Sequence, residues 1–187
     1  RRVLFRSCVF VRLTACDLRC RWCDTPYAFH EGGKRTLASV LDEVATYGCR
    51  LVEITGGEPL LQAEVYPLME ALLAGGYEVM LETGGHRSIA RVPAGVSRIV
   101  DVKCPGSGEA EKNCWENLPL LTPHDEVKFV IADRVDYDYA REVIATHQLV
   151  GRVGAILLSP VHGELPPKQL AEWMLADRLD ARLQDRK

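Results

Sequence analysis

The residues most able to do chemistry in this sequence are three cysteines that lie within eight positions. They are Cys16, Cys20 and Cys23, in a C-x3-C-x2-C arrangement. This spacing directs three thiolates to one small volume, which suits a metal cluster better than a packed core. A 4Fe-4S cube normally takes four Cys ligands, so three local thiolates would leave one iron open to a ligand other than protein. The sequence therefore predicts a cluster with a reactive iron.

A structural zinc site is the alternative explanation of the same cysteines. Zinc sites of this kind usually have four Cys or His ligands, and here His30 or Cys49 could supply the fourth. The sequence has neither a second C-x2-C nor an H-x3-H pair, which disfavours zinc. A zinc-stabilised binding module without catalysis therefore stays open as the less favoured alternative.

A second motif, ITGGEPL at residues 54–60, follows a predicted strand. Two glycines before Glu-Pro often form a simple turn, but glycines also let the backbone approach a ligand closely. The position of the motif, after a strand and downstream of the cysteines, favours the second explanation.

Together, the cysteine motif and ITGGEPL resemble the radical S-adenosylmethionine (SAM) superfamily. Within it, the stretches CVFVRLTACDLRCRWCDT, ITGGEPLLQ, DVKCPGSGE and LLSPVHGELPP resemble the 7-carboxy-7-deazaguanine synthase family over nearly the whole chain. The resemblance implies that SAM binds the open iron and that one electron then releases a 5'-deoxyadenosyl radical. It also implies ring contraction of 6-carboxy-5,6,7,8-tetrahydropterin to 7-carboxy-7-deazaguanine, with loss of ammonia, on the route to queuosine. A glycyl-radical-enzyme activase is the nearest alternative among small radical enzymes.

The resemblance further implies roles for individual residues. It implies that the SAM site includes Trp22, Cys23, Asp24, Gly57, Lys103, Cys104 and Pro105. It implies that the substrate contacts Arg12 and Thr55, and that Glu82 and Thr83 lie on the ribose side of SAM. Finally, it implies that the Thr25 hydroxyl binds a Mg²⁺ ion that holds the substrate carboxylate, which is suitable chemistry for a hard oxygen ligand. Thr25 could instead only cap a turn before Pro26.

Length and composition favour a single domain in the cytoplasm. The chain has 187 residues, 47% of them hydrophobic, which suffices for one core and not for two ordinary domains. No apolar run approaches the roughly 20 residues of a membrane span, and no signal-peptide pattern opens the chain. In a reducing compartment the cysteines are expected to be thiols or metal ligands. The resemblance adds a homodimer and an electron donor such as a flavodoxin or ferredoxin.

Both ends of the chain resemble translated sequencing-library adaptors. These ends are residues 1–7 and 185–187, so we expect the biological part to be 8–184, with part of the substrate pocket missing. Removing five Lys/Arg and one Asp from 23 basic and 26 acidic residues leaves 18 against 25, a net charge of −7. This acidity disfavours a nucleic-acid partner, because such binding needs basic surface. A small-molecule pterin substrate fits better.

Strands alternate with helices along the sequence, which predicts parallel βαβ units. Strands are expected at 8–13, 50–55, 78–83, 98–103, 126–131 and 154–159, and helices at 37–47, 64–73, 135–147 and 167–180. The weakly patterned segment 84–97 and the loop-like segment 105–123 leave the helix layer incomplete. We therefore predict an α/β fold, a partial, open parallel (βα)6-type barrel whose motifs follow its strands, where barrel enzymes place their chemistry.

Polar residues recur on one face of these predicted strands, because residues two apart in a strand share a face. The set comprises Arg12, Glu53, Thr55, Glu82, Asp101, Lys103, Lys128 and Ser159. Burying such residues is costly unless they are paired or bound to a ligand, so they either point to solvent or line a polar site. A polar site suits a charged substrate.

Overall fold

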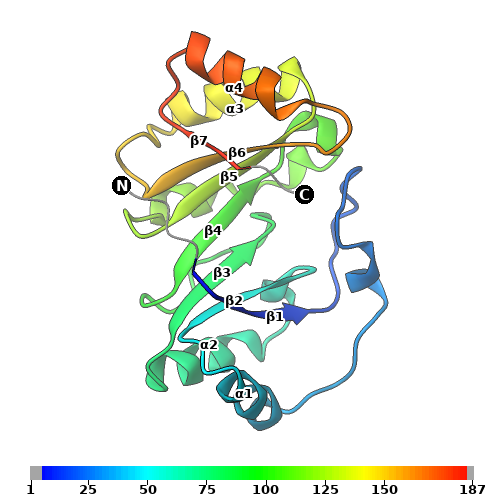
Figure 1. Cartoon of the computed structure of the whole chain (residues 1–187), viewed down its shortest axis with the longest axis vertical. Helices are drawn as coiled ribbons and strands as arrows, with labels where there is room; N and C mark the ends of the chain where they lie inside the picture. Colours follow the sequence, from blue (N-terminus) through cyan, green and yellow to red (C-terminus); the bar gives the residue numbers. More distant parts are fainter. Residues whose placement is uncertain (1–5, 185–187) are drawn as a thin grey trace. The chain divides into compact units, whose positions relative to one another are not determined.

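The computed structural model describes residues 6–184, which form two compact units (Figure 1). The first unit takes in the chain up to Asp17 together with Thr25–Glu82 and Arg91–Ser97. The second takes in Leu18–Asp24, Thr83–Ala90 and the chain from Arg98 onward. The single domain expected over 8–184 stays a prediction.

The expected adaptor-derived ends lie outside the described residues except for Arg6 and Ser7. Arg6 donates two hydrogen bonds to the Glu78 carboxylate, at 2.7 and 2.8 Å. The backbone oxygen of Ser7 lies 2.9 Å from the Cys49 sulfur, in hydrogen-bonding geometry. Both contacts therefore lie within the first unit.

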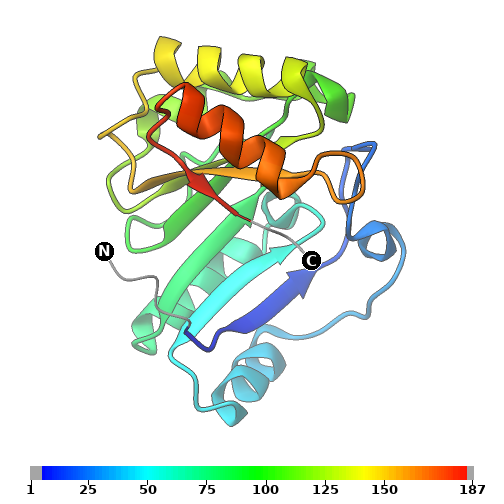
Figure 2. The same cartoon turned by 45° about the horizontal axis from the view of Figure 1, so that its top comes forward.

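Three parallel strands and two helices form the first unit. The strands β1 (Val9–Leu13), β2 (Leu51–Gly56) and β3 (Glu78–Thr83) pair in sequence order. Helix α1 (Leu37–Thr46) connects β1 to β2, and α2 (Val65–Ala74) connects β2 to β3. Figure 2 shows β1 and β2 side by side, in blue and cyan. The apolar side chains of β2 and α2 form the buried centre of this unit, as βαβ packing requires.

The second unit also has a parallel sheet, with β4 (Ser97–Val102), β5 (Glu126–Ile131), β6 (Ala155–Pro160) and β7 (Arg182–Leu183) in sequence order. Helices α3 (Arg134–Thr146) and α4 (Pro167–Ala176) pack beside each other against it (Figures 1 and 2). All six residues of β6 are buried, which explains why five of them are apolar and only Ser159 is polar.

Strand β7 was not predicted, and the last helix ends earlier than predicted. Arg178 adopts a left-handed φ of +51°, which stops α4 at Ala176 instead of near residue 180. The chain then turns back, and Leu183 pairs with Leu158. A two-residue strand is too short to produce a recognisable alternation in the sequence.

The predicted gaps in the helix layer are confirmed. Residues 84–96 contain no α-helix, and the segment between β4 and β5 contains only the 3-10 turns η3 (Pro105–Ser107), η4 (Ala110–Lys112) and η5 (Trp115–Leu120). Within each unit the strands follow the sequence order, β1 to β3 and β4 to β7, and these pairs are all parallel. This confirms the predicted fold class. No helix among the described residues is long and apolar enough to cross a membrane.

Candidate active site

Backbone packs directly against backbone where β1 and β2 end in the first unit. The Gly57 N–H donates to the Leu13 carbonyl, and the Glu58 N–H to the Ala15 carbonyl, both at 2.8 Å. A Cβ added to Gly57 would lie 2.1 Å from the Ala15 oxygen, and one added to Gly56 would lie 2.1 Å from the Leu13 oxygen. Because no side chain fits at either position, the two glycines of the ITGGEPL motif are required by this contact.

The same contact fixes the residue that precedes the first cysteine of the motif. Ala15 has a left-handed φ of +69°, and its N–H donates to the Ala28 carbonyl at 2.7 Å. A Cβ on Gly57 would also lie 3.2 Å from the Cys16 Cβ. Gly57 therefore supports the backbone that presents Cys16, whereas its predicted contact with SAM stays a prediction.

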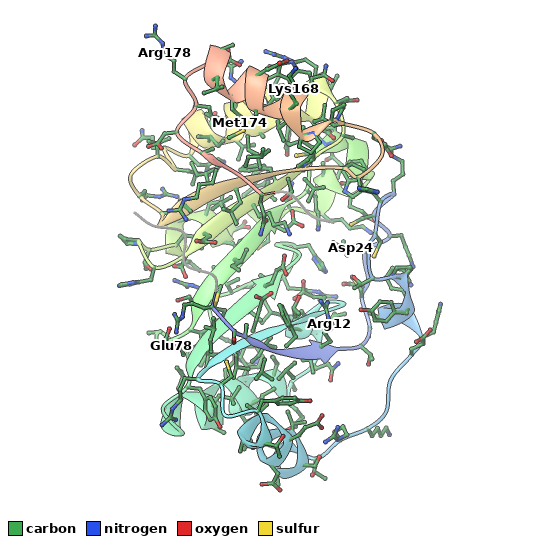
Figure 3. The ribbon with its side chains drawn as sticks, viewed as in Figure 1. Arg12, Asp24, Glu78, Lys168, Met174 and Arg178 are labelled. Carbon is green, nitrogen blue, oxygen red and sulfur yellow. The ribbon has the colours of Figure 1, made fainter. Side chains whose placement is uncertain are left out.

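The two predicted substrate-binding residues are neighbours on adjacent strands. Arg12 of β1 is in register with Thr55 of β2. The Thr55 hydroxyl is buried and donates to the Glu82 carboxylate at 3.3 Å, whereas Arg12 is exposed and projects from β1 (Figure 3). The predicted pair thus combines an exposed cation with a buried hydroxyl on one part of the sheet.

Thr25 lies at the start of the 3-10 turn η1 (Pro26–Phe29). Its carbonyl accepts the Ala28 N–H at 3.0 Å, but its side chain makes no capping hydrogen bond to the turn. The structure therefore does not support the explanation that the Thr25 side chain caps this turn. Its predicted contact with Mg²⁺ stays a prediction.

In the second unit, the turn that carries Cys20 and Cys23 is attached to the segment after β4. Within the turn, the Cys23 N–H donates to the Cys20 carbonyl at 3.2 Å. The Arg21 N–H donates to the Ser107 carbonyl at 3.0 Å. Burial raises the pKa of the Cys20 thiol above its usual value, and the nearby Lys103 opposes this rise. The turn is thus held in place by the protein through its backbone.

Trp22 packs against a glycine that sequence reasoning missed. A Cβ on Gly106 would lie 2.6 Å from an oxygen of Asp136 and 3.0 Å from the Trp22 ring. Asp136 is fully buried and accepts the N–H groups of Gly106 and Ala132, at 2.7 and 3.0 Å. Burial raises the pKa of Asp136, although these two hydrogen bonds oppose the rise. In sequence, Asp136 is indistinguishable from an ordinary acidic residue in the first turn of a helix.

The predicted SAM-binding residues after β4 have different surroundings. The Lys103 ammonium lies 2.8 Å from the Asp101 carboxylate, whose other oxygen is buried without a hydrogen bond. Cys104 is buried, and this burial raises the pKa of its thiol well above the usual value. Pro105 is exposed and begins η3. Asp24, at the end of the cysteine turn, is also exposed.

The polar face predicted from strand alternation is partly buried. Its buried members are Thr55, Asp101, Lys128 and Ser159. Lys128 is 1% exposed and lies in register with Asp101 on the neighbouring strand, so the two residues place opposite charges side by side. The explanation in which every member points to solvent is wrong.

The proposed cluster ligands are divided between the units, with Cys16 in the first and Cys20 and Cys23 in the second. Among the described residues, no three His, Cys, Asp or Glu side chains are grouped to hold a metal ion. Convergence of the three thiols therefore stays a prediction, as does the zinc alternative with His30 or Cys49. All seven cysteines lie outside disulfides, and thiolate is the donor that iron–sulfur clusters use, so the donor chemistry fits.

Curated proteins similar to this chain share one description. A protein of Koribacter versatilis described as 7-carboxy-7-deazaguanine synthase is 50% identical over 190 residues, which cover 94% of this chain and 84% of that protein. A protein of Chlorobaculum tepidum with the same description is 43% identical over 180 residues, covering 95% of this chain and 81% of that protein. These shares are large enough for the comparison to concern the whole chain.

Solved structures match the fold. The crystal structure of QueE from Escherichia coli superposes with a TM-score of 0.70 at 23% identity, covering 96% of this chain and 85% of that one. Streptococcus suis SuiB bound to S-adenosylmethionine superposes with a TM-score of 0.63 at 9% identity, covering 96% of this chain and 50% of that one. Because both identities are low, these matches establish the fold alone.

The sequence model of the Radical SAM superfamily matches residues 11–146. This range contains both the cysteine motif and the glycine motif, and it ends with α3. Together with the two curated relatives, it decides the family. The chain therefore belongs to the radical SAM superfamily and, within it, to the family that contains these 7-carboxy-7-deazaguanine synthases.

Proposed function

We propose that this chain converts 6-carboxy-5,6,7,8-tetrahydropterin to 7-carboxy-7-deazaguanine and ammonia. The observation that carries the proposal is the 50% identity to the Koribacter versatilis synthase over 94% of the chain. The reaction rearranges the ring and releases one nitrogen as ammonia without net oxidation. It therefore needs no stoichiometric oxidant. The relatives favour this activity over a glycyl-radical activase and over a zinc-stabilised module.

Membership in the superfamily implies a 4Fe-4S cluster and SAM as cofactors, and when bound they supply the 5'-deoxyadenosyl radical. In this proposal Cys16, Cys20 and Cys23 hold the cluster. The SAM site comprises Trp22, Cys23, Asp24, Gly57, Lys103, Cys104 and Pro105. The protein's own contribution is to hold these groups in a fixed geometry and to exclude water. The rigid contact of Gly57 with Ala15 supports this role for the first unit.

Substrate binding is assigned to the neighbouring pair Arg12 and Thr55. The exposed guanidinium of Arg12 offers paired N–H donors that suit a carboxylate. The Thr55 hydroxyl, already bonded to Glu82, has an orientation fixed by the sheet. Thr25 is proposed to bind Mg²⁺, which would orient the substrate carboxylate.

The partners follow from the same assignment. The pterin is the substrate, and a flavodoxin or ferredoxin is the proposed electron donor. We propose a cytoplasmic homodimer that binds no nucleic acid. Size-exclusion chromatography with light scattering measures the assembly directly, and a monomer at micromolar concentration would contradict the dimer.

Anaerobic reconstitution tests the activity. The chain is loaded with iron and sulfide, reduced, and incubated with SAM, Mg²⁺ and the carboxy-pterin. We expect a product with the mass of the substrate less one ammonia, and 5'-deoxyadenosine only when SAM is present. Binding of zinc without iron and sulfide, or SAM cleavage without this product, would overturn the proposal.

The Mg²⁺ site is tested with Thr25→Ala, and Thr46→Ala is the matched control at the exposed end of α1. Thr25→Ala should keep the cluster and still cleave SAM, but lose most of the Mg²⁺ stimulation of product formation. The control should respond to Mg²⁺ like the unmodified chain. An unchanged Mg²⁺ response in Thr25→Ala would remove this residue from the site.

A further inference from the structure

Three polar side chains recur at four-residue intervals in the irregular segment between β4 and β5. They are Glu109, Asn113 and Asn117. Each forms hydrogen bonds with the backbone of a different segment within the second unit. The proposed function uses none of the three, and the segment that carries them has no α-helix.

Glu109 attaches the cysteine turn to the segment between β4 and β5. Glu109 is 6% exposed, and its carboxylate accepts the Arg19 N–H at 2.5 Å and pairs with the Lys112 ammonium at 2.7 Å. Hydrogen bonding from Lys112 lowers the pKa of Glu109, and the Arg19 N–H acts in the same direction. An ionised acceptor makes a stronger hydrogen bond than a neutral one, and Arg19 immediately precedes Cys20.

Asn113 attaches the end of β4 to the same segment. Its side-chain oxygen accepts the Lys103 N–H at 2.8 Å, and its side-chain nitrogen donates to the Lys103 carbonyl at 2.9 Å. Both backbone groups of Lys103 are therefore bonded to one amide, much as they would be to a neighbouring strand. The same nitrogen lies 3.4 Å from the Tyr139 hydroxyl of α3.

Asn117 organises the loop that follows β3. It is 1% exposed, and its side-chain oxygen accepts the Ile89 N–H at 3.0 Å. Its side-chain nitrogen donates to the carbonyls of Gly85 and Arg87, at 3.1 and 2.9 Å. One amide thus fixes three backbone groups within a five-residue loop that has no secondary structure of its own.

We infer that Glu109, Asn113 and Asn117 are positioning residues, which hold the cysteine turn, the end of β4 and the loop 85–89 in their binding conformations before any cofactor is present. The inference rests on the proposed function for what these loops bind. The turn carries Cys20 and Cys23, the end of β4 carries Lys103, and the loop follows the ribose-side pair. Ordering these loops in advance lowers the entropy that cofactor binding must otherwise overcome.

The alternative is that these bonds only satisfy buried polar groups and contribute to global stability. The two explanations predict different patterns in the protein without cofactors. Positioning predicts that each substitution loosens its own loop and leaves the other two unchanged. A purely global contribution predicts that all three loops exchange faster together.

Amide hydrogen exchange on the full chain without cofactors, read by NMR, separates these patterns. Glu109→Ala should speed exchange of the Arg19 amide about tenfold, because it loses a bond to a charged acceptor. Asn113→Ala should speed exchange of the Lys103 amide several-fold. Asn117→Ala should speed exchange of the Ile89 amide by a similar factor. Glu109→Gln, which keeps an acceptor oxygen, should restore most of the protection at Arg19. Glu111→Ala, at an exposed position of η4, is the control and should change none of the three amides.

A second measurement uses the reconstituted protein. Glu109→Ala should lose iron to a chelator several-fold faster than the unmodified chain, whereas Asn117→Ala should keep its iron and bind SAM several-fold more weakly. Failure of the unmodified chain to bind iron would contradict the proposed function and leave the exchange pattern intact. Uniform changes at all three loops, or no local change in any variant, would overturn the positioning inference whatever the chain binds.

Discussion

The two units fix the loops after their strands in different ways. In the first unit, the ends of β1 and β2 touch through backbone alone, because Gly56 and Gly57 leave no Cβ between them and the backbone of Leu13 and Ala15. In the second unit, polar side chains from the segment after β4 reach across to the backbone of other loops. A glycine contact restricts the residue type at its own position, whereas the partner of a side-chain contact across 90 residues cannot be identified from the sequence.

The difference also concerns charge. The contacts of Gly56 and Gly57 carry no titratable group, so they are insensitive to pH. The second unit relies on buried carboxylates whose pKa values are shifted in opposite directions, lowered for Asp125 and raised for Asp136. As the pH falls, the stabilisation that the ionised Asp125 carboxylate gives to the second unit should therefore be lost.

The largest effect is expected at the cysteines, because the proposed cluster depends on all three thiolates. Replacing Cys16, Cys20 or Cys23 by Ala should abolish iron retention after anaerobic reconstitution, since three thiolates already leave one iron open. The matched controls are Cys8→Ala, Cys49→Ala and Cys114→Ala, which should keep their iron. A control cysteine as necessary as the three would overturn the open-iron arrangement, and iron and sulfide analysis measures this.

The next largest effect is expected at a buried ion pair in the second unit. The Asp125 side chain is 1% exposed and pairs with Arg98 at 2.6 Å, while also accepting the N–H and hydroxyl of Thr122. Asp125→Ala should lower the free energy of unfolding by about 3–5 kcal/mol, because it leaves the Arg98 charge partly buried without its partner. Urea denaturation measures the loss. Asp138→Ala, at an exposed position of α3, is the control and should change little.

The same residue gives a pH dependence with a definite sign. Burial alone would raise the pKa of Asp125, but hydrogen bonds from Arg98 and Thr122 outweigh it, and the pKa is lowered. A lowered pKa means that the stabilisation is present above the unfolded value of about 3.9 and is lost as the pH falls below it. The difference in stability between the unmodified chain and Asp125→Ala should therefore shrink below about pH 4. A constant difference down to pH 3 would contradict this assignment.

The glycine contact of the first unit should show a smaller loss of stability. Gly57→Ala would place a Cβ 2.1 Å from the Ala15 oxygen, so the ends of β1 and β2 must separate. We expect a loss of about 1–3 kcal/mol and weaker iron retention through Cys16. Gly33→Ala is the control in the same unit, because a Cβ there meets nothing within 4 Å. Equal stabilities for the two variants would show that the close contact is not needed.

Much of the fold could be predicted from the sequence because its signals are local. The ranges predicted for β3 and β5 match the observed strands, since period-two patterns bounded by turns define them. Strand β7 was not predicted because two residues are too few to show an alternating pattern. The segment between β4 and β5 was correctly predicted to lack an α-helix, but its function as a source of long-range contacts could not be seen in its composition.

The residues of the candidate site also differ in whether the sequence could predict them. The cysteine and glycine motifs were visible because chemistry and close backbone contact restrict the residue types allowed. Glu109, Asn113, Asn117 and Asp136 were not singled out, because polar residues in a loop or a first helical turn are ordinary in sequence. Their importance depends on partners that only the three-dimensional structure identifies.

The smallest effect tests whether a side-chain contact becomes predictable when its partner is close in sequence. Thr36 precedes the helix that starts at Leu37, and its hydroxyl accepts the N–H of Ser39, three residues on, at 3.1 Å. Thr36→Ala should cost about 1 kcal/mol of stability, because one N–H at the start of α1 loses its acceptor. Thr36→Ser should keep the bond and lose little, as measured by urea denaturation. Since α1 belongs to the first unit, neither variant should change exchange at the Arg19 amide, whereas Glu109→Ala should. A change at Arg19 in Thr36→Ala would mean that the two kinds of contact are coupled and that the contrast between the units does not hold.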